Sequence, residues 1–140
     1  MKRQRATVIV EIDGQILLVQ NRGGLLLLPG GGIGAHETRL EAAARELAEE
    51  TRLGAESLLF LFSHESSTHC HNVFWAAAAG TPVAGDDAMA LDFYDQRQPD
   101  LTFSKMSQAT REIIERFLAI QASLPPAFAG AGTTTPLVKR

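Results

Sequence analysis

The sequence lacks several features that define common classes of protein. Its 140 residues include one cysteine, Cys70, which excludes an intramolecular disulfide and a cysteine-rich zinc site. It has no basic excess, because 13 lysines and arginines stand against 16 acids and the net charge is −3. A chain with a pI near 5.8 is not expected to bind bare duplex nucleic acid, which requires a basic surface. Nucleotides that bring a divalent cation with their phosphates remain compatible with this charge.

Long apolar runs are also missing. The densest apolar stretch, Leu25–Leu28, is far shorter than the roughly 20 residues that span a bilayer. The basic residues at 2–5 resemble the start of a signal peptide, but Glu11 and Asp13 soon interrupt the apolar residues that follow. We therefore expect a cytoplasmic protein with no membrane partner.

The sequence does contain an ordered series of strand and helix patterns. Apolar and β-branched residues predict strands over 7–12, 15–20, 25–28, 56–64, 70–79 and 89–94. Asp13-Gly14 is a strong hairpin signal between the first two strands. Helices are predicted after Thr38 and over 105–121. This order predicts an α+β domain over 1–123, with a mixed sheet covered by helices on its faces.

The pattern ends near Leu124. Paired prolines, alternating alanine and glycine, and three threonines follow it, with too little apolar periodicity to pack. We therefore predict a disordered C-terminal tail over 124–140.

The first predicted helix has a clear beginning. Thr38 and Glu41 form a T-x-x-E capping box, in which each side chain accepts a hydrogen bond from the other residue's free backbone N–H. An apolar stripe at helical spacing follows, made of Leu40, Ala43, Ala44 and Leu47. A glycine-rich loop, 30–34, precedes the helix.

Three carboxylates gather on a neighbouring face of this helix. Glu46 and Glu50 lie one turn apart and Glu49 lies beside them, which disfavours a bare helix by a few tenths of a kcal/mol. A hard divalent cation would compensate this repulsion, whereas a merely solvated acidic face is the simpler alternative. The glycine loop in front favours the cation, because such loops direct backbone groups at phosphate or metal.

The segment that contains these residues resembles the Nudix box, G-x5-E-x7-R-E-U-x-E-E-x-G-U, where U is aliphatic. Here it reads Gly31-x5-Glu37-x7-Arg45-Glu46-Leu47-x-Glu49-Glu50-x-Arg52-Leu53. The order of the surrounding elements resembles a whole Nudix domain over roughly 6–122. The resemblance implies an α/β/α sandwich with a mixed β-sheet between helices.

The resemblance also implies an activity. Nudix enzymes are pyrophosphohydrolases that cleave a nucleoside diphosphate linked to another group, with Mg²⁺ or alternatively Mn²⁺ as cofactor. The resemblance implies that the side chains of Glu46, Glu49 and Glu50 and the carbonyl of Gly30 bind the metal. Arg45 would orient the glutamates and Glu37 would pair with Arg45, and favourable charge at a helix N-terminus is a second reading of Glu37. The first candidate for the general base is Glu46, and the catalytic set implied is Glu37, Arg45, Glu46 and Glu49.

Further candidates lie around the box. Arg22 and Gly31 are candidates for binding the substrate phosphates, although a solvated turn residue is the simpler reading of Arg22. Because some Nudix enzymes take the base from a later loop, Asp86, Asp87 and Asp92 are alternatives, although each also reads as an ordinary surface acid.

His69 and His71 alternate on a predicted strand and therefore face the same side of it. Without a third ligand close in sequence they favour polar groups of a binding pocket, or surface residues, over a zinc site.

The one mismatch to the box is Arg52, where the family has a glycine. The left-handed backbone conformation that a glycine would adopt at the end of the helix lowers stability by about 1 kcal/mol or more when an arginine adopts it. We therefore expect Gly54 to take over this cap and the helix to be slightly longer. Because all the carboxylates precede Arg52, the metal site is expected to be unaffected.

The substrate is left open. Residues 68–71, about 15–18 positions after the box, contain neither the proline of Nudix subgroups acting on ADP-ribose nor the tyrosine of those acting on dinucleoside polyphosphates. This absence favours hydrolysis of nucleoside triphosphates to a monophosphate and pyrophosphate. The alternatives are a catalytically silent nucleotide-binding module on the same fold and a structural protein with a solvated acidic helix. The resemblance also implies a homodimer as one oligomeric state.

Overall fold

The computed structural model of the chain describes residues 2–86, 88–98, 102–124 and 133–134. The helical elements are α1 (Arg39–Thr51), a 3-10 turn η2 (Phe103–Lys105) and α2 (Gln108–Ser123). The strands are β1 (Arg3–Ile12), β2 (Gln15–Gln20), β3 (Leu26–Leu27), β4 (Gly30–Gly32), β5 (Gly54–Glu65), β6 (His69–Ala79), β7 (Ala90–Tyr94) and β8 (Thr133–Thr134).

These strands form one mixed sheet around the long central strand β1. The main order is β3-β2-β1-β6-β5, with β4 and β8 paired to β1 and β7 paired to β2. β1 runs parallel to β6 and to β8, and the other pairs are antiparallel. The predicted hairpin at Asp13-Gly14 is present, with positive φ at both residues. The predicted α+β class with a mixed sheet is therefore confirmed.

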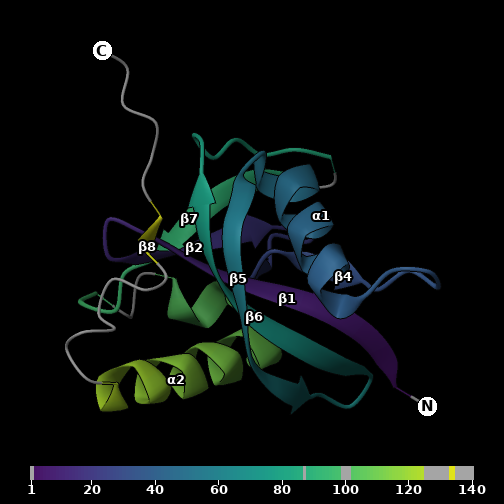
Figure 1. The fold of residues 1–140 in the computed structure, drawn as a ribbon. Coiled ribbons are helices and arrows are strands. Elements are labelled where there is room, and N and C mark those ends of the chain that lie inside the picture. The colour runs from purple at the N-terminus through teal and green to yellow at the C-terminus, as the bar shows by residue number, and fades with distance from the viewer. Residues whose placement is uncertain (1, 87, 99–101, 125–132, 135–140) are drawn as a thin grey trace.

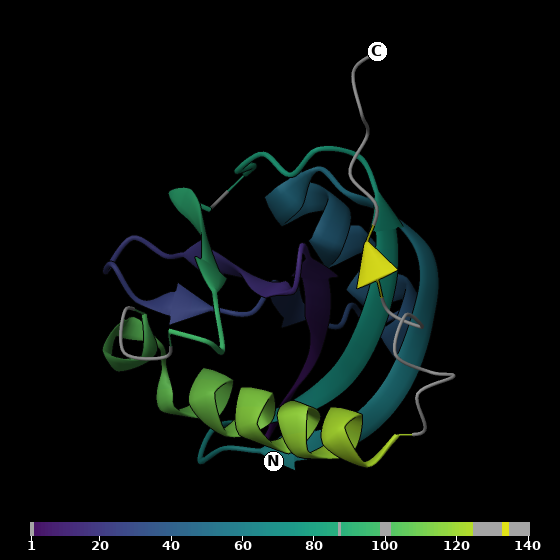
Figure 2. The same ribbon diagram turned by 90° about the vertical axis from the view of Figure 1, so that its left-hand side faces the viewer.

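A helix covers each face of this sheet (Figure 1; Figure 2). Because side chains alternate along a strand, Ala6, Val8 and Val10 of β1 pack on the α1 side, with Ala43 and Leu47. Ile9 packs on the opposite side with α2, in a second cluster that includes Phe117. The layers are thus helix, sheet and helix, as the Nudix resemblance implies.

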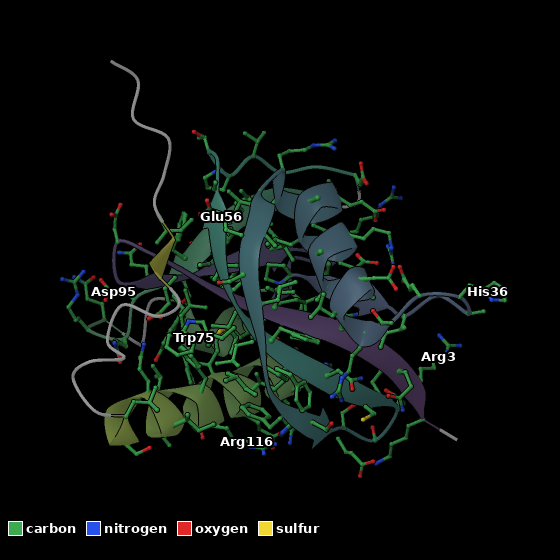
Figure 3. All side chains as sticks on the ribbon, in the orientation of Figure 1. Arg3, His36, Glu56, Trp75, Asp95 and Arg116 are labelled. Atoms are coloured by element: carbon green, nitrogen blue, oxygen red, sulfur yellow. The ribbon has the colours of Figure 1, made fainter. Side chains whose placement is uncertain are left out.

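Trp75 lies in the second cluster, between the sheet and α2 (Figure 3). Its ring packs edge-on against Phe117, with a centroid distance of 5.2 Å, and its indole N–H donates to Glu11 Oε1 at 3.2 Å. The buried Trp75 therefore satisfies its one polar atom while filling the core.

The apolar stripe predicted on α1 is partly wrong. Ala43 and Leu47 are buried as expected, but Leu40 is 50% exposed. Ala42 and Thr51 are buried instead, so the buried face is rotated away from Leu40. Thr51 satisfies its hydroxyl by donating to the carbonyl of Leu47 at 2.6 Å.

Among the described residues, no helix is both long and apolar enough to cross a bilayer. The predicted tail over 124–140 falls mostly outside the described residues, and within it Thr133–Thr134 pairs with Glu11 and Ile12 of β1.

Candidate active site

The first three glycines of the predicted loop over 30–34 belong to the sheet, so the prediction of a loop is wrong for these residues. Gly30, Gly31 and Gly32 form β4, which pairs with Thr7, Ala6 and Arg5 of β1. A Cβ on Gly30 would overlap the carbonyl oxygen of Ala6, so only glycine permits this close approach of the two strands. The pairing places the Gly30 N–H where it donates to Glu50 Oε1 at 2.8 Å.

Gly31 has a different neighbour. A Cβ there would overlap Oε1 of Glu46, so the carboxylate occupies the space of a missing side chain. The strand and the helix therefore meet through two contacts, Gly30 with Glu50 and Gly31 with Glu46.

Arg45 holds the acidic side chains around it in place. Its Nε donates to Glu37 Oε2 at 3.0 Å, and its Nη1 donates to Glu46 Oε1 at 2.8 Å and to Glu49 Oε2 at 3.2 Å. Its Nη2 donates to the carbonyl of Gly32 at 3.1 Å and to Glu37 Oε1. One guanidinium thus ties together the turn before α1, strand β4 and two turns of the helix.

This network also shifts the pKa values of its members. The hydrogen bonds from Arg45, followed by the one from the Gly34 N–H, lower the pKa of Glu37 to about 2. The bonds from Arg45 to Glu37 and Glu46 raise the pKa of the guanidinium above its ordinary value. The Glu37–Arg45 pair is therefore fully ionised at neutral pH.

A cavity of about 340 Å³ lies against this arrangement. Its lining includes Glu46, Glu49 and Glu50 from α1 together with Gly30 and Gly31 from β4. The structure therefore brings the predicted metal-binding residues to one cavity.

The loop between β6 and β7 closes one side of the cavity. The N–H of Gly85 donates to the carbonyl of Glu50 at 3.0 Å, and the N–H of Val83 donates to that of Thr51 at 2.9 Å. These bonds satisfy carbonyls that the end of α1 leaves free. They also carry Asp86 to the cavity, which it lines.

The expected cap at Gly54 is wrong. Arg52 itself takes the left-handed conformation, with φ 62° and ψ 13°, and its N–H donates to the carbonyl of Ala48. Gly54 instead begins β5. Arg52 Nη2 lies 3.3 Å from Asp86 Oδ1, so the residue that replaces the box glycine contacts the loop beside the cavity.

The other residues that the sequence suggested for the site are not found among the described residues that line this cavity. Arg22 lies in the exposed turn after β2, and neither it nor Asp92 of β7 is among the described residues that line the cavity. Asp87 lies outside the described residues. Sequence reasoning missed Arg5, Gln20 and Asn21, which do line it, because strand pairing rather than proximity in sequence brings them there.

The donor chemistry of this site fits a hard divalent cation. Glu46, Glu49, Glu50 and Asp86 offer carboxylate oxygens to one cavity, which suits Mg²⁺. Within the part of the chain that the structure describes, no three acidic, histidine or cysteine side chains converge on a common point. Arg45 and the Gly30 N–H hold the glutamates instead.

Comparison with known proteins identifies the family. The model of the NUDIX domain matches residues 1–117, so the chain belongs to the NUDIX family. An ADP-ribose pyrophosphatase from Methanocaldococcus jannaschii is 35% identical over 107 residues, which are 68% of this chain and 63% of that protein. The match thus spans less than two thirds of that relative's length.

Solved structures agree with this assignment. A nudix hydrolase family member from Chromobacterium violaceum superimposes with a TM-score of 0.81 at 26% identity, covering 94% of this chain and 86% of the other. A MutT NUDIX hydrolase from Burkholderia pseudomallei gives a TM-score of 0.68 at 27% identity, covering 82% and 97%. The helix–sheet–helix arrangement is therefore the NUDIX fold.

Proposed function

We propose that the chain is a divalent-metal-dependent pyrophosphohydrolase that cleaves the diphosphate linkage of a nucleoside diphosphate derivative. The observation that carries this proposal is that Glu46, Glu49 and Glu50 line one cavity together with Gly30 and Gly31. A solvated acidic helix face would not require the paired glycines or the guanidinium that holds these glutamates.

The metal, taken as Mg²⁺, would be held by the carboxylates of Glu46, Glu49 and Glu50 and by the carbonyl of Gly30. When bound, such a cation neutralises charge on the diphosphate and lowers the pKa of a bound water. Mn²⁺ has the same preference for oxygen ligands and is the alternative.

The chain's own residues then have distinct tasks. Arg45 orients Glu46 and Glu49 through the hydrogen bonds that it donates to them, and Glu37 fixes the guanidinium from the other side. Glu46 is our choice of general base, because its carboxylate lies against Gly31 at the edge of the cavity. Asp86 is the alternative base, since it lines the same cavity from a separate loop.

The substrate that we favour is a nucleoside triphosphate, cleaved to the monophosphate and pyrophosphate. The name of the Methanocaldococcus jannaschii relative makes ADP-ribose the second candidate. A panel of both, assayed for orthophosphate, pyrophosphate and nucleoside monophosphate with Mg²⁺ present, distinguishes them by their products.

Replacement of Glu50 tests the site. Glu50→Gln removes a charge with little change of shape, and we expect turnover to fall by a factor of at least about 100, since transition-state charge stabilisation is lost. Glu56→Gln is the matched control, because Glu56 is an exposed carboxylate on β5 outside the cavity. Unchanged turnover in Glu50→Gln contradicts the metal assignment, and a wild-type protein that cleaves no member of the panel supports the silent binding module.

A further inference from the structure

Arg5 occupies an unusual place beside the glutamates. The cavity of about 340 Å³ that Glu46, Glu49 and Glu50 line is the proposed diphosphate cavity. Arg5 is the only lysine or arginine among the described residues that line it, where it joins four acidic side chains. Among the residues described, it forms no ion pair with any of them. A half-buried guanidinium without a carboxylate partner in the described part of the chain is suited, at such a cavity, to a phosphate.

Arg5 also lines a second cavity, of about 370 Å³. The two cavities share Arg5 and Leu27, so they adjoin at these side chains. The second one lies between β1 and β6 on one side and α2 on the other, and α2 contributes Ile113 to its wall.

The polar side chains that line this second cavity include a hydrogen-bonded pair. Thr7 Oγ1 lies 3.1 Å from His71 Nδ1, and both residues line the cavity. Burial, followed by the positive charge of Arg5 and the neighbouring histidines, lowers the pKa of His71 to about 4. The ring is therefore neutral at pH 7, with one donor and one acceptor nitrogen.

The exposed surface of the lining is mostly apolar, and Leu25, Leu27, Leu28 and Ile113 contribute to it. Besides Arg5, Thr7 and His71, the polar residues of the lining are Ser66, Thr68, His69, Ser107 and Thr110. Apolar walls with a few fixed polar groups suit a planar heterocycle whose edge carries hydrogen-bonding atoms. A second phosphate group would instead call for several cations, and Arg5 is the only lysine or arginine among the described residues that line this cavity.

We propose that Arg5 binds the phosphate that carries the nucleoside, and that the base of this nucleoside enters the second cavity and is recognised by Thr7 and His71. This inference rests on the proposed function, because it places the organic group of the same substrate. It makes Arg5, rather than Arg22, the cationic side chain that contacts the diphosphate.

Arg5→Gln tests the first half of the proposal. We expect KM for the nucleotide to rise about tenfold or more, as for the loss of a charged hydrogen bond. Arg3→Gln is the matched control, since Arg3 lies two residues earlier on the same strand, is exposed and lines neither cavity (Figure 3). Equal effects of the two substitutions would show a general charge effect and overturn the assignment of Arg5.

Thr7→Val and His71→Gln test the second half. Each is expected to raise KM for the nucleotide severalfold while the inhibition constant of inorganic pyrophosphate, which has no base, stays within about twofold. Equal changes for both ligands, or no change for either, would overturn base recognition by this pair.

A binding measurement separates this proposal from the proposed function. The histidine ring signals in the NMR spectrum are followed while AMP, GMP, CMP or UMP is added to the wild-type protein. We expect the signals of His71 to shift and those of His36, in the exposed turn before α1, to stay (Figure 3). If the wild-type protein shows no turnover but the His71 signals shift, the proposal of a base cavity stands and the proposed hydrolase function is wrong. Unmoved His71 signals with all four monophosphates overturn the cavity assignment, whatever the activity.

Discussion

Glu37 is not among the described residues that line the cavity of Glu46, Glu49 and Glu50, and it contacts Arg45 instead. Its pKa of about 2 reflects the hydrogen bonds from Arg45 and from the Gly34 N–H. Because the pKa in the folded state is depressed, the resulting stability is present above the ordinary value near 4.5 and is lost as the pH falls toward 2.

The pH dependence of stability checks this pair. The difference in unfolding free energy between the wild type and Glu37→Gln, measured by urea denaturation, should be constant above about pH 5 and shrink between pH 4.5 and 2. In Arg45→Met the pKa of Glu37, followed through its carboxyl carbon by NMR, should rise toward 4.5. A wild-type Glu37 that titrates near 4.5 would contradict the network.

Arg52 adopts a backbone conformation that favours glycine. With φ at 62° it carries a cost of about 1 kcal/mol, which its exposed ion pair with Asp86 offsets only in part. Arg52→Gly should therefore raise the unfolding free energy by about 0.5–1 kcal/mol.

Arg52→Ala is the control, because it removes the same ion pair but retains a Cβ in the left-handed region. It should not stabilise the protein, in contrast to Arg52→Gly. The affinity for Mg²⁺, measured by calorimetry, should change little in either variant, and a large gain in Arg52→Gly would contradict the view that this position lies outside the metal site.

At the scale of elements, the loop between β6 and β7 depends on one glycine. A Cβ on Gly85 would lie 2.5 Å from the carbonyl oxygen of Glu49 and 2.7 Å from Arg52 Nε. Gly85→Ala must therefore move this loop away from the end of α1, and Asp86 with it. We expect kcat/KM to fall about tenfold or more while circular dichroism stays unchanged.

Gly54→Ala is the matched control for this loop. A Cβ at Gly54 meets nothing within 4 Å, so the activity of Gly54→Ala should equal that of the wild type. Full activity in Gly85→Ala would mean that the position of the loop has no part in catalysis.

Helix α1 offers a direct comparison of two leucines. Leu47 is fully buried against the sheet, whereas Leu40 is 50% exposed. Leu47→Ala should lower the unfolding free energy by about 2–5 kcal/mol, and Leu40→Ala by less than about 1 kcal/mol. Similar losses in chemical denaturation would mean that Leu40 is buried, as its spacing alone suggests.

At the scale of the whole molecule, the NUDIX match ends at residue 117 and α2 ends at Ser123. We predict that a chain shortened after Leu124 folds, with an unfolding free energy within about 1 kcal/mol of the full chain, because both helix–sheet clusters are retained. Thr133–Thr134, which pairs with β1, is the part of the removed segment that this experiment tests. A larger loss in urea denaturation would assign those residues to the domain.

The sequence alone determined the features that depend on local spacing. The capping box of Thr38 and Glu41, the hairpin at Asp13-Gly14 and the shared helix of Glu46, Glu49 and Glu50 could all be predicted, because backbone hydrogen bonds and helical periodicity act over a few residues. The box spacing likewise indicated the family.

Only the tertiary structure decided which distant residues meet. Arg5 lines the same cavity as the glutamates because β4 pairs with β1, and Asp86 lines it because its loop donates to the end of α1. Spacing alone could not bring Arg5 to this cavity, because strand pairing between distant segments places it there. Nor could spacing exclude Leu40 from the core, because burial depends on how the helix is rotated against the sheet. Strand pairing and packing between remote segments therefore completed the lining of a cavity whose glutamates the local sequence had already placed on one helix.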